Sequence, residues 1–98
     1  MNILSWNCRG SGGVSTIPIL RRYIRSTGAV LVFISETKCN KVVAAKRIAQ
    51  LQLPNFEIVS ARGQGGGLWL LWADEVAVEI LESNIFFIVA KINLGPRA

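Results

Sequence analysis

Hydrophobic residues in the first third of the chain follow a strand-like pattern and then a helix-like one. Residues 2–7 predict a short β-strand with apolar members at positions 3, 4 and 6. An aliphatic stripe then recurs at intervals of three and four residues, formed by Ile17, Leu20 and Ile24. This period is typical of an amphipathic helix, which we expect to begin at Ser15 or Thr16 and to end at Gly28.

A second strand and a second helix follow. Residues 29–35 form a continuous apolar run, typical of a parallel strand that is buried on both faces. The order strand, helix, strand predicts a βαβ unit. Residues 41–53 predict the second helix, which Pro54 ends. The residues expected on its inward face are Val42, Ala45, Ile48, Ala49 and Gln52.

The second half of the chain carries the pattern of strands alone. Four strands are predicted, at residues 56–60, 67–72, 76–81 and 85–92. Residues 73–75 and 82–84 are short enough for hairpin turns, so we expect these strands to form an antiparallel meander. The predicted fold class is therefore α/β, with a βαβα unit followed by an antiparallel meander.

This order of elements leaves apolar surface without cover. Two helices are available for about six strands, and the last strand is almost wholly apolar. A central strand needs a neighbour at each edge and cover on both faces. We therefore expect residues 1–98 to be the N-terminal portion of a single domain that is incomplete at its C-terminus. An exposed sheet edge would allow such a chain to self-associate.

Composition narrows the chemistry that the chain can perform. The sequence contains no histidine, which excludes Ser-His-Asp and Cys-His catalysis within the chain. Eleven basic and six acidic residues give a net charge of +5, which favours a polyanionic partner such as nucleic acid. A solvated basic surface is the alternative explanation of this charge.

The same composition predicts an intracellular protein. The longest apolar run is too short to cross a bilayer, and residues 2–6 predict a strand instead of a signal peptide. Cys8 and Cys39 form no disulfide framework and no zinc motif, so we expect two reduced thiols. These features predict a protein that is neither secreted nor bound to a membrane.

Two polar residues stand where the predicted parallel strands end. Asn7 ends the first strand, and Glu36 follows the second. Because ligands of α/β sheets gather beyond the carboxyl ends of the strands, both side chains are expected at one rim. A carboxylate beside an amide oxygen suits Mg²⁺, which completes its shell with water and phosphate oxygens. Lys38 would add positive charge for a phosphate group.

Simpler roles are open for the same residues. Glu36 would also serve as a helix cap or as a salt-bridge partner, and Asn7 as a turn-capping amide. Residues 10–15 are similar to a dinucleotide-binding loop, with Glu36 on a ribose hydroxyl, but Ser15 replaces the third glycine. Residues 63–67 form a second glycine cluster without the Lys-Ser/Thr ending of a P-loop, and close backbone packing is its expected role.

Three segments occur in an order that resembles the endonuclease/exonuclease/phosphatase superfamily. They are MNILSWNCRG at residues 1–10, SETKC at 35–39 and GGLWLLW at 66–72. They look most like the endonuclease domain at the N-terminus of plant non-LTR retrotransposon polyproteins, which is similar to apurinic/apyrimidinic endonucleases. The resemblance implies a four-layered α/β sandwich, here truncated, and hydrolysis of DNA phosphodiester bonds with a divalent metal, usually Mg²⁺.

The resemblance also implies roles for individual residues. Asn7 would belong to the catalytic hydrogen-bonding and metal site, Glu36 would be the metal-ligating acid, and Lys38 would be an active-site neighbour. Some apurinic-type members carry an acid two residues after the asparagine, where this chain has Arg9. The catalytic Tyr, Asp-x-Asn and Asp-His of the family's second half have no match here.

The resemblance and these departures together predict a fragment of a DNA endonuclease that binds Mg²⁺ weakly or not at all and is inactive alone. Its expected location is nuclear or cytoplasmic. The alternative is a non-catalytic remnant that binds DNA or RNA. A dinucleotide-binding βαβ unit is the third candidate.

Overall fold

The computed structural model describes residues 1–9, 16–63 and 65–93, and its N-terminal part is the predicted βαβ unit. Strand β1 (Ile3–Asn7) pairs in parallel with β2 (Leu31–Ser35), and helix α1 (Thr16–Thr27) connects them. Gly28 ends the helix with a φ of 65°, a left-handed value that glycine adopts without steric cost. Its N–H donates to the carbonyl of Ile24 at 3.0 Å. The sequence prediction for this part of the chain is confirmed.

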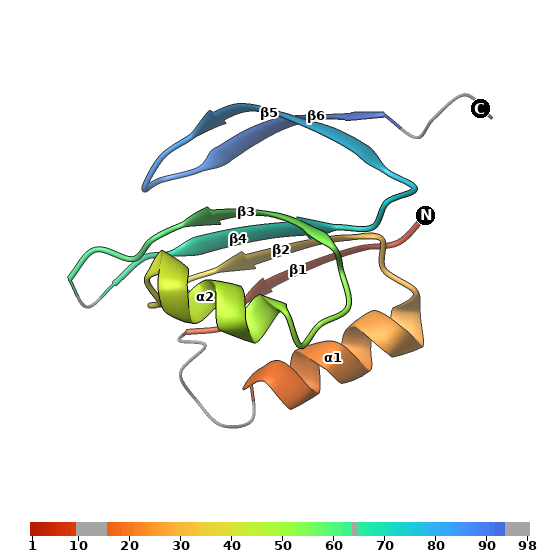
Figure 1. The fold of residues 1–98 in the computed structure, drawn as a ribbon, viewed down its shortest axis with the longest axis horizontal. Coiled ribbons are helices and arrows are strands. Elements are labelled where there is room, and N and C mark those ends of the chain that lie inside the picture. Colours follow the sequence, from red (N-terminus) through yellow and green to blue (C-terminus); the bar gives the residue numbers. More distant parts are fainter. Residues whose placement is uncertain (10–15, 64, 94–98) are drawn as a thin grey trace.

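Two further strands complete a four-stranded sheet. Strand β4 (Leu68–Trp72) pairs antiparallel with β2 on one side and with β3 (Asn55–Val59) on the other, which gives the order β1-β2-β4-β3. Because β3 is antiparallel to β4, it runs in the same direction as β1 and β2. The carboxyl ends of these three strands therefore lie at one rim of the sheet, together with the start of β4 (Figure 1).

The predicted antiparallel meander is interrupted after β4. Strands β5 (Ala77–Ser83) and β6 (Ile88–Asn93) pair with each other in a separate two-stranded hairpin. Both edges of β4 are already occupied by β2 and β3, so the chain leaves the sheet after Trp72. The turn of the hairpin also lies later than predicted, because the Asn84 side chain accepts hydrogen bonds from the N–H groups of Phe86 and Phe87.

Helix α2 (Lys41–Ile48) is shorter than predicted, and its buried face is a different one. Ala44 and Ile48 are its buried residues. Of the residues expected on the inward face, only Ile48 is buried; the exposed ones are Val42, Ala45, Ala49 and Gln52. After the helix the Leu51 N–H donates to the Ile48 carbonyl, and Gln52 has a φ of 63°. This tight turn directs Leu51 into the core and ends the helix before Pro54.

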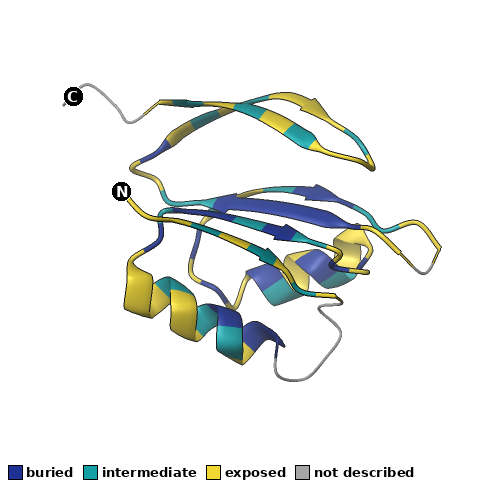
Figure 2. Cartoon of the chain, turned by 180° about the vertical axis from the view of Figure 1, so that it is seen from behind, coloured by how far each residue is buried: buried dark blue, intermediate teal, exposed yellow. Residues whose placement is uncertain are grey.

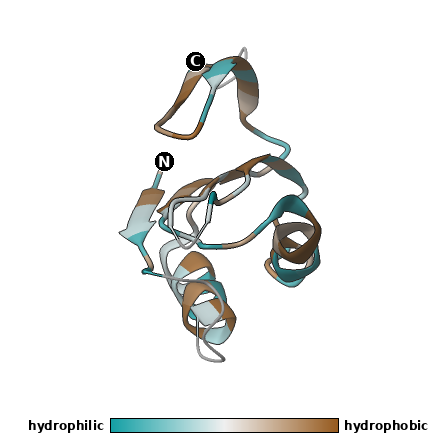
Figure 3. Cartoon of the chain, turned by 90° about the vertical axis from the view of Figure 1, so that its left-hand side faces the viewer, coloured by the Kyte–Doolittle hydropathy of each residue, from teal (hydrophilic) through white to brown (hydrophobic). Residues whose placement is uncertain are grey.

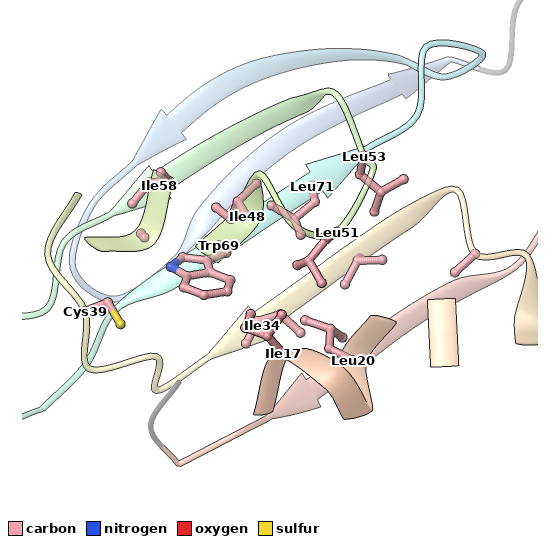
Figure 4. Packing of buried hydrophobic residues seen from close by; sticks show 13 residues of the cluster. Ile17, Leu20, Ile34, Cys39, Ile48, Leu51, Leu53, Ile58, Trp69 and Leu71 are labelled. Atoms are coloured by element: carbon pink, nitrogen blue, oxygen red, sulfur yellow. The ribbon is translucent and has the colours of Figure 1, made fainter. Parts of the chain in front are cut away.

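The hydrophobic core lies between the helices and one face of the four-stranded sheet (Figure 4). Trp69 of β4 lies within it and has no exposed surface. The remaining buried members are Ile17, Leu20, Ala29, Val32, Ile34, Cys39, Ala44, Ile48, Leu51, Leu53, Ile58 and Leu71. Alternation along β2 and β4 sends one set of side chains to this core and the other set to the opposite face of the sheet.

The β5–β6 hairpin lies over that opposite face (Figures 1 and 2). The buried strand residues outside the main core are Leu31, Val59, Leu68 and Leu70. Helices, sheet and hairpin thus form successive layers, consistent with the predicted truncated α/β sandwich. Hydrophobic segments run through the hairpin as well as through the sheet (Figure 3). No helix in the described ranges is long and apolar enough to cross a membrane.

Candidate functional site at the carboxyl rim of the sheet

Asn7 and Glu36 meet at the rim where β1 and β2 end. The strand register places Asn7 opposite Ser35, so Glu36 follows immediately beyond the paired residues. The Asn7 side-chain amide donates to a Glu36 carboxylate oxygen, with Nδ2 and Oε2 2.6 Å apart. The Asn7 Oδ1 accepts the N–H of Arg9 at 3.3 Å, which orients the amide. Both Asn7 and Glu36 are exposed, so a ligand reaches the pair from solvent.

The backbone after Glu36 has an unusual conformation. Glu36 and Lys38 have φ values of 54° and 57°, in the left-handed region that residues with side chains seldom adopt. Thr37 between them has no exposed surface. Its N–H donates to the Gly67 carbonyl at 3.2 Å, and the Lys38 N–H donates to the Gly66 carbonyl at 2.8 Å. The turn therefore exposes Glu36 and Lys38 on either side of a buried anchor, Thr37.

Arg62 follows β3, which is the third strand that ends at this rim. Its N–H donates to the Gly65 carbonyl at 3.0 Å, beside the Gly66 carbonyl that Lys38 uses. Arg9, Lys38 and Arg62 are all exposed, and each follows one of the three strands that end at this rim. Arg62 is not among the site residues that the sequence predicts. The available signal was its place just after a strand, which became meaningful only once β3 was known to run parallel to β2.

The described residues supply an incomplete set of metal ligands. Glu36 is a suitable carboxylate for Mg²⁺. Nevertheless, the ranges that the structure describes contain no group of three or more His, Cys, Asp or Glu residues able to hold a metal. Asn7 presents its amide nitrogen to Glu36 and its oxygen to the Arg9 N–H, so it acts here as a hydrogen-bonding partner of the carboxylate. Magnesium ligation by Asn7 and Glu36 stays a prediction.

Two apolar hollows lie away from this rim. One, of about 290 Å³, is lined by α2 and the start of β3 and includes Ile48 and Phe56. The other, of about 160 Å³, lies between β1 and α1 and includes Trp6 and Tyr23. Neither lining includes a charged residue, whereas the rim carries Glu36 and Lys38, so the rim is the candidate site. The glycine-rich segment 10–15 of the dinucleotide hypothesis lies outside the described residues.

Comparison with known proteins bears on the fold. No protein-family model matches the sequence, and the search of curated proteins returned no match. Among solved structures, the chain is similar to the crystal structure of the Xenopus laevis APE2 catalytic domain, with a TM-score of 0.58 and 21% sequence identity. The match covers 82% of this chain but only 26% of that one. The chain thus has the fold of part of that catalytic domain.

Proposed function

We propose that this chain is the N-terminal part of an endonuclease-type domain, and that by itself it binds DNA without cleaving it. The observation that carries the proposal is the Asn7–Glu36 hydrogen bond at the carboxyl rim, with Lys38 beside it. The similarity to the APE2 catalytic domain supports the fold that this proposal assumes. Descent from a plant retrotransposon endonuclease and a nuclear or cytoplasmic location belong to this proposal.

The cations of the rim provide the DNA-binding step. Arg9, Lys38 and Arg62 are exposed and each follows a strand that ends at this rim, where Glu36 is the acid, so the rim has an excess of positive charge. Each cation that neutralises a phosphate releases counterions from DNA, which makes binding favourable at low ionic strength and weak at high ionic strength. These contacts recognise the phosphate backbone and not the bases, so RNA is a second expected ligand for the same surface.

Cleavage is not expected, because the groups that it needs are absent from the described site. Glu36 is the single carboxylate placed at the Asn7 hydrogen bond, and the sequence has no histidine to serve as an acid or a base. One carboxylate leaves most of the magnesium shell to water, which predicts weak binding of the ion. Lys38 would then orient a phosphate group without taking part in bond cleavage.

The proposal is tested by measuring binding and cleavage on the same DNA. In a gel-shift assay at low ionic strength, the purified chain should retard DNA and lose this binding as salt is added. Supercoiled plasmid incubated with the chain and Mg²⁺ should stay intact. Glu36→Ala should bind DNA at least as tightly, because it removes negative charge from the rim.

Two results would overturn parts of this proposal. Absence of binding at low ionic strength would reject the DNA-binding function. Magnesium-dependent nicking that disappears in Glu36→Ala would show that the rim is catalytically competent. Arg25→Ala is the control for a general loss of positive charge, because Arg25 is an exposed cation in the last turn of α1 and not at the rim.

A further inference from the structure

Thr37 connects the candidate site to a second segment of the chain. It is fully buried, whereas its neighbours Glu36 and Lys38 are exposed and both have positive φ. Residues with side chains keep such conformations only where the surrounding structure holds them. The surrounding structure here is the Gly66–Gly67 segment, whose two carbonyls accept the N–H groups of Lys38 and Thr37.

Gly67 is the point of closest approach between the two segments. A Cβ atom at Gly67 would overlap the Thr37 Oγ1 and lie 3.1 Å from the Lys38 backbone nitrogen. Its φ of 94° is a conformation that other residues rarely adopt. Gly67 is itself buried, so an added methyl group has no solvent to move into. Substitution would therefore push Thr37 away, and the turn on both sides of Thr37 would move with it.

We propose that Gly67 is a positioning residue for the phosphate-binding rim, acting through Thr37 to set the places of Glu36 and Lys38. The inference rests on the proposed function of the rim. The path of contacts runs from Gly67 to Thr37, from Thr37 to the adjoining Glu36, and from the Glu36 carboxylate to the Asn7 amide at 2.6 Å. Gly67 touches neither DNA nor metal in this role.

Neighbouring glycines offer matched controls for the two effects of a substitution at Gly67, which are backbone strain and the collision with Thr37. Gly65 has no positive φ in the left-handed range, and a Cβ there would meet nothing within 4 Å. Gly66 has a φ of 78°, but a Cβ there would also meet nothing within 4 Å. Alanine at Gly65 thus tests neither effect, alanine at Gly66 tests backbone strain alone, and alanine at Gly67 combines strain with the collision.

The experiment compares Gly65→Ala, Gly66→Ala and Gly67→Ala in the full chain. The NMR signal of the Asn7 side-chain amide reports its hydrogen bond to Glu36 without any DNA, and thermal unfolding reports folding. Gly67→Ala should shift the Asn7 amide signal and weaken DNA binding as much as Lys38→Ala does. Gly65→Ala should leave both unchanged, and Gly66→Ala should change the Asn7 signal less than Gly67→Ala.

Each outcome decides the proposal. A folded Gly67→Ala variant whose Asn7 signal is unchanged would overturn it. If Gly67→Ala does not fold, the double variant Gly67→Ala/Thr37→Ala decides, because it removes the hydroxyl that the new methyl group would strike. Recovered folding with the Asn7 signal of the Thr37→Ala single variant supports the proposal, because the push on Thr37 is then gone. No recovery, or a signal displaced from that of Thr37→Ala, rejects it. A shifted signal without any DNA binding in the wild-type chain would leave Gly67 as the positioning residue and reject only the DNA-binding function.

Discussion

The Asn7 amide donates to the Glu36 carboxylate at 2.6 Å, although 29 positions of sequence separate the two residues. This contact exists because β1 and β2 are parallel neighbours that end at the same rim. A hydrogen bond of this length to a carboxylate is of the charge-assisted kind. It aligns the acid that would meet a metal ion.

Asn7→Asp should destabilise the chain and at the same time create a better metal site. It replaces a donor by a second carboxylate beside Glu36, so the free energy of unfolding should fall by about 1 kcal/mol without divalent ions. Added Mg²⁺ should restore the loss, because two carboxylates are a common protein contribution to a magnesium site. Thermal unfolding with and without Mg²⁺ measures both effects.

The control for this prediction removes one of the two acids. In the Asn7→Asp/Glu36→Gln double variant the stabilisation by Mg²⁺ should disappear. Equal stabilisation of the wild-type chain and of Asn7→Asp by Mg²⁺ would contradict a metal-binding rim.

Removal of a rim cation should flatten the salt dependence of DNA binding. Lys38→Ala and Arg62→Ala should each lower the slope of log K against log salt by about one, if each side chain neutralises one phosphate. Fluorescence anisotropy with a labelled duplex at several salt concentrations measures this slope. Arg25→Ala should leave the slope as it is, and an equal change in all three variants would point to diffuse attraction without a defined site.

Substitution of Trp69 should test whether the chain folds as a cooperative unit. The side chain is fully buried between the sheet and the helices, so Trp69→Ala should cost about 3–5 kcal/mol. That loss is comparable with the whole stability of many small domains, so the unfolding transition should shift far down or vanish. Val42→Ala, at a residue that is 67% exposed, should change the transition little. Circular dichroism melts compare the two, and a similar effect of both substitutions would argue against the described core.

The turn of the β5–β6 hairpin should promote self-association. Phe86 is 79% exposed and Phe87 is 43% exposed, next to strands whose outer edges have no partner strand among the described residues. Phe86→Ser should therefore shift the chain towards the monomer in sedimentation velocity experiments over a range of concentrations. Val42→Ser removes another exposed apolar group, on α2, and should not change the association. Association that is unaffected by Phe86→Ser would place the contact elsewhere.

Local chemistry accounts for the elements that the sequence predicted well. The first strand, the first helix and the buried second strand follow from hydrophobic period and from Gly28, whose left-handed φ ends the helix. The predicted inward face of the second helix is wrong because the apolar positions of this helix fit two faces. Packing against β3 selected the face that carries Ala44 and Ile48 and left Val42 in solvent.

The sequence by itself determined the βαβ unit, the α/β class and the strand ends that carry Asn7 and Glu36, because these depend on residues that are close along the chain. Only the tertiary structure decided that β4 lies between β2 and β3, that β5 and β6 leave the sheet, and that Arg62 joins Lys38 at the rim. It also decided the contact of Gly67 with Thr37. Strand order and side-to-side packing arise from pairings between distant segments, and competition for the two edges of β4 is invisible in any local pattern.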